Sequence, residues 1–93
     1  MESQLTDEQK TEIEELASLF FTDDEIVVIM QLPEDTLQRL NVDDFYLPFK
    51  RGRLKKEAEL RKSIFNLAVN GSSPAQILAT QIIKESELKN IPV

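Results

Sequence analysis

Residues that break helices are scarce in this chain. It has two glycines and four prolines among 93 residues, and the segments 1–32 and 53–70 contain neither. Glycine and proline supply most of the tight turns that join neighbouring strands. A chain with so few of them, and with long stretches free of both, is more typical of helices. We therefore predict an all-α fold.

Two capping boxes predict where the first helices begin. Thr6 with Gln9, and Thr22 with Glu25, each place a hydroxyl three residues before a Gln or Glu side chain. In this pattern the two residues exchange side chain to backbone hydrogen bonds at a helix start. Apolar residues then follow at helical spacing. The apolar run 26–30 alone would also suit a buried strand, but the cap just before it favours a helix.

Further boundaries follow from proline and glycine. Pro33 is expected to end the second helix, because the residue before a proline is pushed out of the α region. A short third helix is predicted over residues 34–40. Residues 41–48 are interpreted as a connector whose aromatic side chains dock on the core. Gly52 is expected to break the chain before a longer helix that covers residues 54–69.

The last part of the chain is predicted to be a helical hairpin. Asn70 and Gly71 form a stop signal, since glycine accepts the left-handed conformation that follows many helices. Ser73 is then expected to cap the last helix, with Pro74 at its first position and Gln76 closing a capping box. Two helices joined by so short a turn are expected to pack antiparallel.

Charge is distributed unevenly along the chain. Residues 1–49 hold thirteen acidic and two basic side chains, a net charge of −11, whereas residues 50–62 hold seven basic and two acidic ones, a net charge of +5. We name residues 50–62 the basic segment. The sequence predicts a helix-turn-helix-like three-helix unit with its connector over residues 1–49. The basic segment and the αα-hairpin, expected to be the oligomerisation region, occupy residues 50–93.

The composition argues against several classes of function. The chain has no cysteine and no histidine, which excludes disulfides and thiolate metal sites and removes the commonest general base. Its paired acids lie at helix starts or in the connector, where capping explains them. We expect no enzyme and no cofactor. With no membrane-length apolar run and no signal-peptide pattern, we expect a cytoplasmic protein without a membrane partner.

The segment 16–39 has the order helix, tight turn, helix, tight turn, helix. A unit of this kind can place its third helix in a DNA major groove. Most short helical triplets are only packed cores, and the acidic first half opposes DNA binding. The basic segment is the plausible phosphate-binding element, although it could equally be a cationic hinge that pairs with the acidic half. The candidate DNA-binding residues are Thr36, Gln38, Arg39, Lys50, Arg51, Arg53, Lys55 and Lys56.

The helices of the predicted hairpin carry more apolar residues than one contact between two helices can cover. Apolar area of this kind usually marks an interface. We therefore expect self-association, although the same residues could instead cover the three-helix unit. The candidate oligomerisation residues are Leu60, Ile64, Leu67, Leu78, Ile82 and Ile83.

The order of these motifs resembles a known family. The segment from Glu15 to Ile26 looks like the opening of phage small terminase subunits and their helix-turn-helix relatives, and residues 32–37 continue the likeness. The stretches 51–53 and 59–71 are similar to the part that follows in those proteins. The tail 72–76 looks like a variant of their helix restart. The resemblance spans residues 12–88, although no single motif in it is diagnostic.

The resemblance implies a function. Small terminase subunits are ring-forming, non-enzymatic proteins that bind viral double-stranded DNA and regulate the large terminase subunit during packaging. The chain departs from the pattern at Val27, where the family prefers alanine, and at Gln31, where glycine usually makes the turn. Arg39 is the single base of the third helix. Two alternatives remain: a dimeric helix-turn-helix transcriptional regulator, and a helical interaction module that does not bind DNA.

Overall fold

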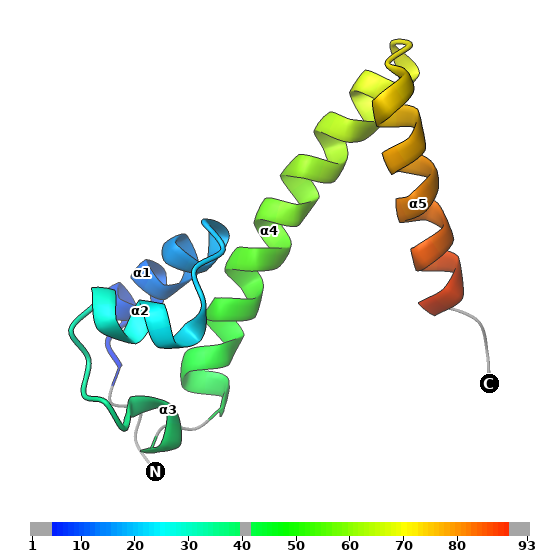
Figure 1. Ribbon diagram of the computed structural model, residues 1–93. Helices are drawn as coiled ribbons and strands as arrows, with labels where there is room; N and C mark the ends of the chain where they lie inside the picture. The colour runs from blue at the N-terminus through cyan, green and yellow to red at the C-terminus, as the bar shows by residue number, and fades with distance from the viewer. Residues whose placement is uncertain (1–4, 40–41, 90–93) are drawn as a thin grey trace. The chain divides into compact units, whose positions relative to one another are not determined.

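The structure, a computed structural model, describes residues 5–39 and 42–89. It contains five helices and, within the described residues, no strand, which confirms the predicted all-α class (Figure 1). The helices are α1 (Asp7–Ser18), α2 (Asp23–Ile29), α3 (Thr36–Arg39), α4 (Val42–Val69) and α5 (Ser73–Lys89). The chain divides into two compact units, Met1–Glu57 and Ala58–Val93, which we call unit 1 and unit 2. Helix α4 contributes residues to both.

The starts of α1 and α2 are fixed by the two predicted capping boxes. The Thr6 Oγ1 accepts from the Gln9 amide at 3.0 Å, and the Thr6 amide donates to the Gln9 Oε1 at 2.9 Å. Thr22 and Glu25 make the same exchange at 3.2 and 2.8 Å. Each box satisfies amides that a helix start otherwise leaves without partners. Both predicted boxes are confirmed, and the run 26–30 lies in α2 and its C-cap.

Helix α2 ends at a left-handed residue and not at Pro33. Gln31 has φ 56°, its amide donates to the Val28 carbonyl at 3.1 Å, and the Leu32 amide donates to the Val27 carbonyl at 3.0 Å. These two bonds form a Schellman motif, which satisfies carbonyls at the helix end. The chain has therefore left the helix before Pro33, and the prediction that Pro33 ends it was wrong.

We expect Gln31→Gly to raise the free energy of unfolding by about 0.5–1 kcal/mol. A left-handed conformation costs a non-glycine residue about 1–2 kcal/mol, and part of this gain is offset by the greater flexibility of glycine in the unfolded chain. Urea unfolding followed by circular dichroism measures the change. Glu12→Gly, at an exposed position inside α1, is the control and should destabilise by a similar amount. A destabilised Gln31→Gly variant would contradict this account of the turn.

Helix α4 corrects two predictions. It runs without a break from Val42 to Val69, so residues 42–48 are helical and not a connector, and Gly52 lies inside the helix. Leu40 and Asn41 lie outside the described residues. Pro48 lies within α4 and is buried. A proline has no amide hydrogen, so the carbonyl four residues earlier loses its helical partner without the helix ending.

Gly52 serves a close approach between helices. A Cβ atom built on Gly52 would meet the backbone carbonyl group of Glu14, with its carbon at 2.9 Å, and the Ala17 Cβ at 3.1 Å. The backbone of α1 therefore crosses α4 at a distance that only glycine permits. The sequence pattern suggested a helix break here, but the residue is needed for packing.

The core of unit 1 lies where α1, α2 and the first turns of α4 meet. The aromatic residues predicted to dock on the core do so from α4: Phe45 is 1% exposed, and its ring centroid lies 5.3 Å from that of Tyr46 and 6.1 Å from that of Phe49. Edge-on and offset contacts of this kind stabilise aromatic clusters. The buried core residues are Leu5, Ile13, Ala17, Ile26, Val27 and Phe45.

Unit 2 contains the end of α4, a short turn and α5. Gly71 has φ 101°, its amide donates to the Ala68 carbonyl, and the Ser72 amide donates to the Leu67 carbonyl at 3.0 Å. This second Schellman motif confirms the predicted stop. The chain reverses direction there, and the two helices diverge from the turn (Figure 1).

The start of α5 differs from the prediction by one residue. Helix α5 begins at Ser73, so Ser72 is the residue before it, and the Ser72 Oγ accepts from the Ala75 amide at 3.4 Å. The Gln76 side chain does not close a capping box. Its Nε2 donates to the Ala68 carbonyl at 3.1 Å and so ties α5 to the end of α4.

Candidate nucleic-acid and self-association surfaces

Arg53, a predicted DNA contact, is held within unit 1. Its Nη2 donates to the Phe21 carbonyl at 3.0 Å, in the turn between α1 and α2. Its Cζ lies 5.3 Å from the ring centroid of Phe20 and 4.7 Å from that of Phe49, so the guanidinium makes two cation–π contacts. The Nε is buried without a hydrogen-bond partner. Arg53 therefore joins α4 to the turn between α1 and α2.

Two other basic residues share one carboxylate of α1. The Lys55 Nζ lies 2.8 Å from one oxygen of Glu14, and the Arg51 Nη1 lies 3.8 Å from the other. The Arg51 and Lys55 side chains remain 53% and 65% exposed. One negative charge cannot neutralise two cations, and ion pairs this exposed are weak. Arg51 and Lys55 together thus keep a net positive charge, although both pair with Glu14 in the acidic first half of the chain.

The remaining candidate DNA-binding residues differ in how much of each side chain is exposed. Thr36 is 3% exposed, and its hydroxyl donates to the Pro33 carbonyl at 2.6 Å, so its side chain supports the start of α3. Gln38 and Lys50 are exposed, and Lys56 is half-buried. The side chain of Arg39 lies outside the described residues. The candidates that reach the surface are therefore Gln38, Lys50, Arg51 and Lys55.

A hydrogen bond from α4 to α2 has no counterpart in the sequence analysis. The Tyr46 hydroxyl donates to the Asp23 Oδ2 at 2.6 Å, and the Asp23 Oδ1 accepts from the Asp24 amide at 2.7 Å. The hydrogen bond to Asp23, followed by burial and the charges of Asp23 and Asp24, raises the pKa of Tyr46 to about 12. Tyr46 thus stays a donor. No local pattern could reveal this pair, because the partners are 23 residues apart.

The predicted oligomerisation residues of unit 2 are largely on its surface. Leu60, Leu67, Leu78 and Ile83 are about half exposed, whereas Ile64 and Ile82 are half-buried. Sequence reasoning missed further exposed apolar residues. These are Val69, Ile77 and Leu88.

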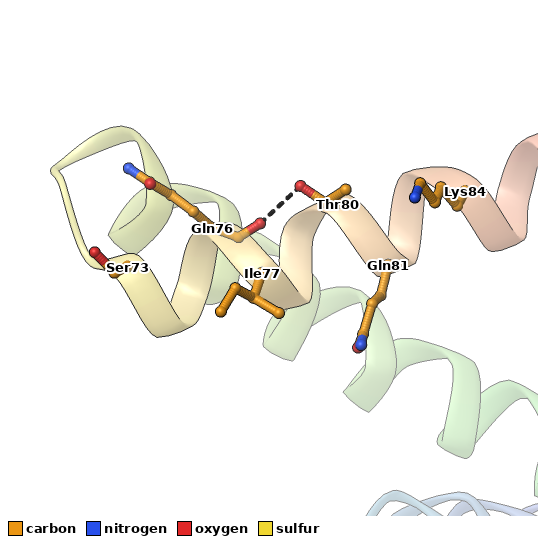
Figure 2. A pocket seen from close by; sticks show the side chains of 6 residues that line it. All are labelled: Ser73, Gln76, Ile77, Thr80, Gln81 and Lys84. Carbon is orange, nitrogen blue, oxygen red and sulfur yellow. Dashed lines mark hydrogen bonds between the residues drawn. The ribbon is translucent and has the colours of Figure 1, made fainter.

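A shallow hollow lies on the surface of α5 (Figure 2). All of its lining residues belong to this one helix, and the Thr80 hydroxyl donates to the Gln76 carbonyl at 2.9 Å along the helix. A hollow formed by one helix is an open surface and not an enclosed site. Its lining residues are Ser73, Gln76, Ile77, Thr80, Gln81 and Lys84.

Residues 5–39 and 42–89 contain no group of three or more acidic side chains placed to hold a metal ion. Within the same residues, no helix combines the length and the apolar character that crossing a membrane requires. Comparison of the chain with protein-family models, curated proteins and solved structures gives no match.

Proposed function

We propose that this chain is a non-enzymatic adaptor that self-associates through unit 2 and acts in phage DNA packaging, as a small terminase subunit does. The observation that carries the proposal is the burial pattern of unit 2. The side chains that it buries are alanines, Ala75 and Ala79, while most of its leucines and isoleucines are exposed. Large apolar residues are normally the buried ones. This pattern supports self-association through unit 2.

The exposed apolar side chains of unit 2 supply free energy of the same order as the cost of association. Full burial of a leucine or isoleucine contributes about 1.5–3 kcal/mol, so about 1 kcal/mol remains for each half-exposed side chain. Leu60, Leu67, Leu78 and Ile83 from each of two copies would together supply about 8 kcal/mol. Association costs about 4–15 kcal/mol in lost freedom of motion. Burial of the other exposed apolar residues of unit 2 would add to this favourable free energy.

The proposal includes a finer arrangement of the fold. Helices α1 to α3 would act as a helix-turn-helix-like head, and α4 and α5 as an antiparallel hairpin that mediates assembly into a ring. The large terminase subunit would be the protein partner. The likeness of residues 12–88 to small terminase subunits supports these assignments, together with the all-helical fold.

Self-association is tested by sedimentation equilibrium of the whole chain. We expect an oligomer, and we expect Leu67→Gln with Leu78→Gln to weaken its association constant by about tenfold or more, since at least 1.4 kcal/mol of apolar burial is lost. The matched control is Leu19→Gln with Leu47→Gln, which removes two exposed leucines of unit 1. A wild-type chain that stays monomeric at high concentration would exclude the proposal.

The DNA-binding part of the proposal rests on the exposed cations of α4. Lys50, Arg51 and Lys55 reach the surface, and Glu14 offsets only one of these charges. We expect Lys50→Gln with Lys55→Gln to weaken binding to duplex DNA and to reduce the salt dependence of the logarithm of affinity by about two units. Fluorescence anisotropy across a salt series measures both.

The control replaces Lys84 and Lys89, two exposed lysines of α5, with glutamine. It removes the same charge, and we expect binding to change less. Duplex DNA that fails to bind the wild-type chain even at low salt would exclude a DNA-binding adaptor. A dimer that binds two half-sites about one helical turn apart would instead favour a transcriptional regulator.

The second candidate is a helical interaction module that does not bind DNA. A specific observation favours it: Arg51, Arg53 and Lys55, three of the predicted phosphate contacts, already have partners inside unit 1. Oligomerisation without DNA binding is its expected signature.

A further inference from the structure

Helix α2 presents an apolar surface with an acidic rim. Ile26 and Val27 enter the core, whereas Val28 is 74% and Ile29 44% exposed. These two residues line a shallow groove with Phe21, Asp24 and Glu25, which we name the α2 groove. The acidic rim would repel nucleic acid, so a fitting occupant is apolar and cationic.

The chain itself carries a surface of this chemistry. On the exposed side of α4, Leu54 is 55% exposed and lies within one helical turn of Arg51 and Lys55. We name these three residues the α4 face. Arg51 lies three residues before Leu54 and four before Lys55. Residues three and four apart lie on one side of a helix, so Leu54 and Lys55 each share a side of α4 with Arg51. Arg51 and Lys55 both pair with the single carboxylate of Glu14, so positive charge remains on the patch.

We propose that the α2 groove of one copy binds the α4 face of a second copy. Leu54 would enter the groove against Phe21, Val28 and Ile29, while the two cations approach Asp24 and Glu25. The groove has an apolar centre and acidic edges, and the face has an apolar residue beside two cations, so the two surfaces are complementary. The groove and the face are different patches of the same chain, so the contact is heterologous. Each copy can then bind two neighbours, one through each patch.

The contact cannot form within a single copy. Gly52 packs α4 against α1, and Arg53 fixes the same part of α4 to the Phe21 carbonyl. The α4 face is therefore fixed in unit 1 and cannot move onto the groove of its own chain. The proposed contact also differs from self-association through unit 2, because both of its surfaces belong to unit 1.

The test combines two variants, each defective on one side of the contact. Both carry Leu67→Gln and Leu78→Gln to suppress association through unit 2. Val28→Lys then places a cation in the groove, and Leu54→Glu places an acid in the face; both positions are exposed. The parent chain carries only Leu67→Gln and Leu78→Gln, so its groove and face are intact, and we expect it to associate. We expect each variant alone to be monomeric. We expect an equimolar mixture of the two variants to form a heterodimer. The mixture retains one intact groove and one intact face.

Sedimentation velocity at low and high salt, without DNA, measures all three samples. Added salt should weaken the heterodimer, because screening acts on exposed opposite charges. Complementation also shows that both variants are folded, since a misfolded chain could not restore the contact. A mixture that stays monomeric, or variants that associate like the parent, would overturn the proposal. The result does not depend on whether unit 2 associates. The two variants carry the same substitutions in unit 2 and differ only in unit 1.

The α4 face overlaps the cations assigned to DNA under the proposed function. The two contacts would then exclude each other at Arg51 and Lys55, which is why the mixing experiment omits DNA.

Discussion

Replacing Gly52 with alanine is expected to destabilise unit 1 by about 3 kcal/mol, although alanine is the better helix former by about 1 kcal/mol. The new methyl group would collide with the backbone carbonyl group of Glu14, which cannot rotate away as a side chain can. Helix α1 must therefore move off α4. That movement opens the core at Ile13 and Ala17, both of which are fully buried.

Tyrosine fluorescence during urea unfolding measures this effect. Tyr46 is the only tyrosine of the chain, which has no tryptophan, so the signal reports on unit 1 alone. Gly71→Ala is the matched control: a Cβ at Gly71 meets nothing within 4 Å, and the cost of its φ of 101° is confined to unit 2. It should leave the tyrosine transition in place. If Gly52→Ala were as stable as the wild type, α1 and α4 could not be this close.

Arg53→Ala is expected to destabilise unit 1 by about 2.5–5 kcal/mol. The substitution removes a charged hydrogen bond to the Phe21 carbonyl, worth about 1.5–3 kcal/mol, and two cation–π contacts, worth about 0.5–1 kcal/mol each. Arg53→Lys should recover little of this loss, because an ammonium group cannot stack on both rings and reach the carbonyl.

The control is Arg51→Ala, two residues earlier in the same helix. Arg51 is half exposed and lies 3.8 Å from its carboxylate partner, so its removal should cost less than about 1 kcal/mol. Urea unfolding followed by tyrosine fluorescence compares the two variants. Equal losses at the two positions would show that Arg53 is not a structural contact. The role assigned to it as a DNA contact would then regain support.

Several features of the fold could be predicted from the sequence. The capping boxes at Thr6 and Thr22 and the stop at Gly71 depend on hydrogen bonds or backbone angles within a few residues of each position. Local patterns describe such features fully, because no distant part of the chain takes part in them. The all-α class follows from the same signals and from the scarcity of glycine and proline.

The candidate sites could be predicted only in part. The exposure of Leu60, Leu67 and Leu78 agrees with the excess of apolar residues that the sequence shows in this region. The basic segment did not form one uniform surface. Arg53 lies among aromatic rings, while Lys50 remains exposed. A charge count gives the sum over a segment, but not which cations a neighbouring helix covers.

The sequence by itself determined the helical class, the two capped helix starts and the turn at Gly71, since each depends on short-range hydrogen bonding or backbone freedom. Only the tertiary structure decided what Gly52 and Pro48 do. Both usually end helices, yet α4 continues through them: α1 packs against Gly52, and Pro48 is buried. Packing between distant segments outweighs a local preference of about 1–3 kcal/mol, and no local pattern records which segments meet.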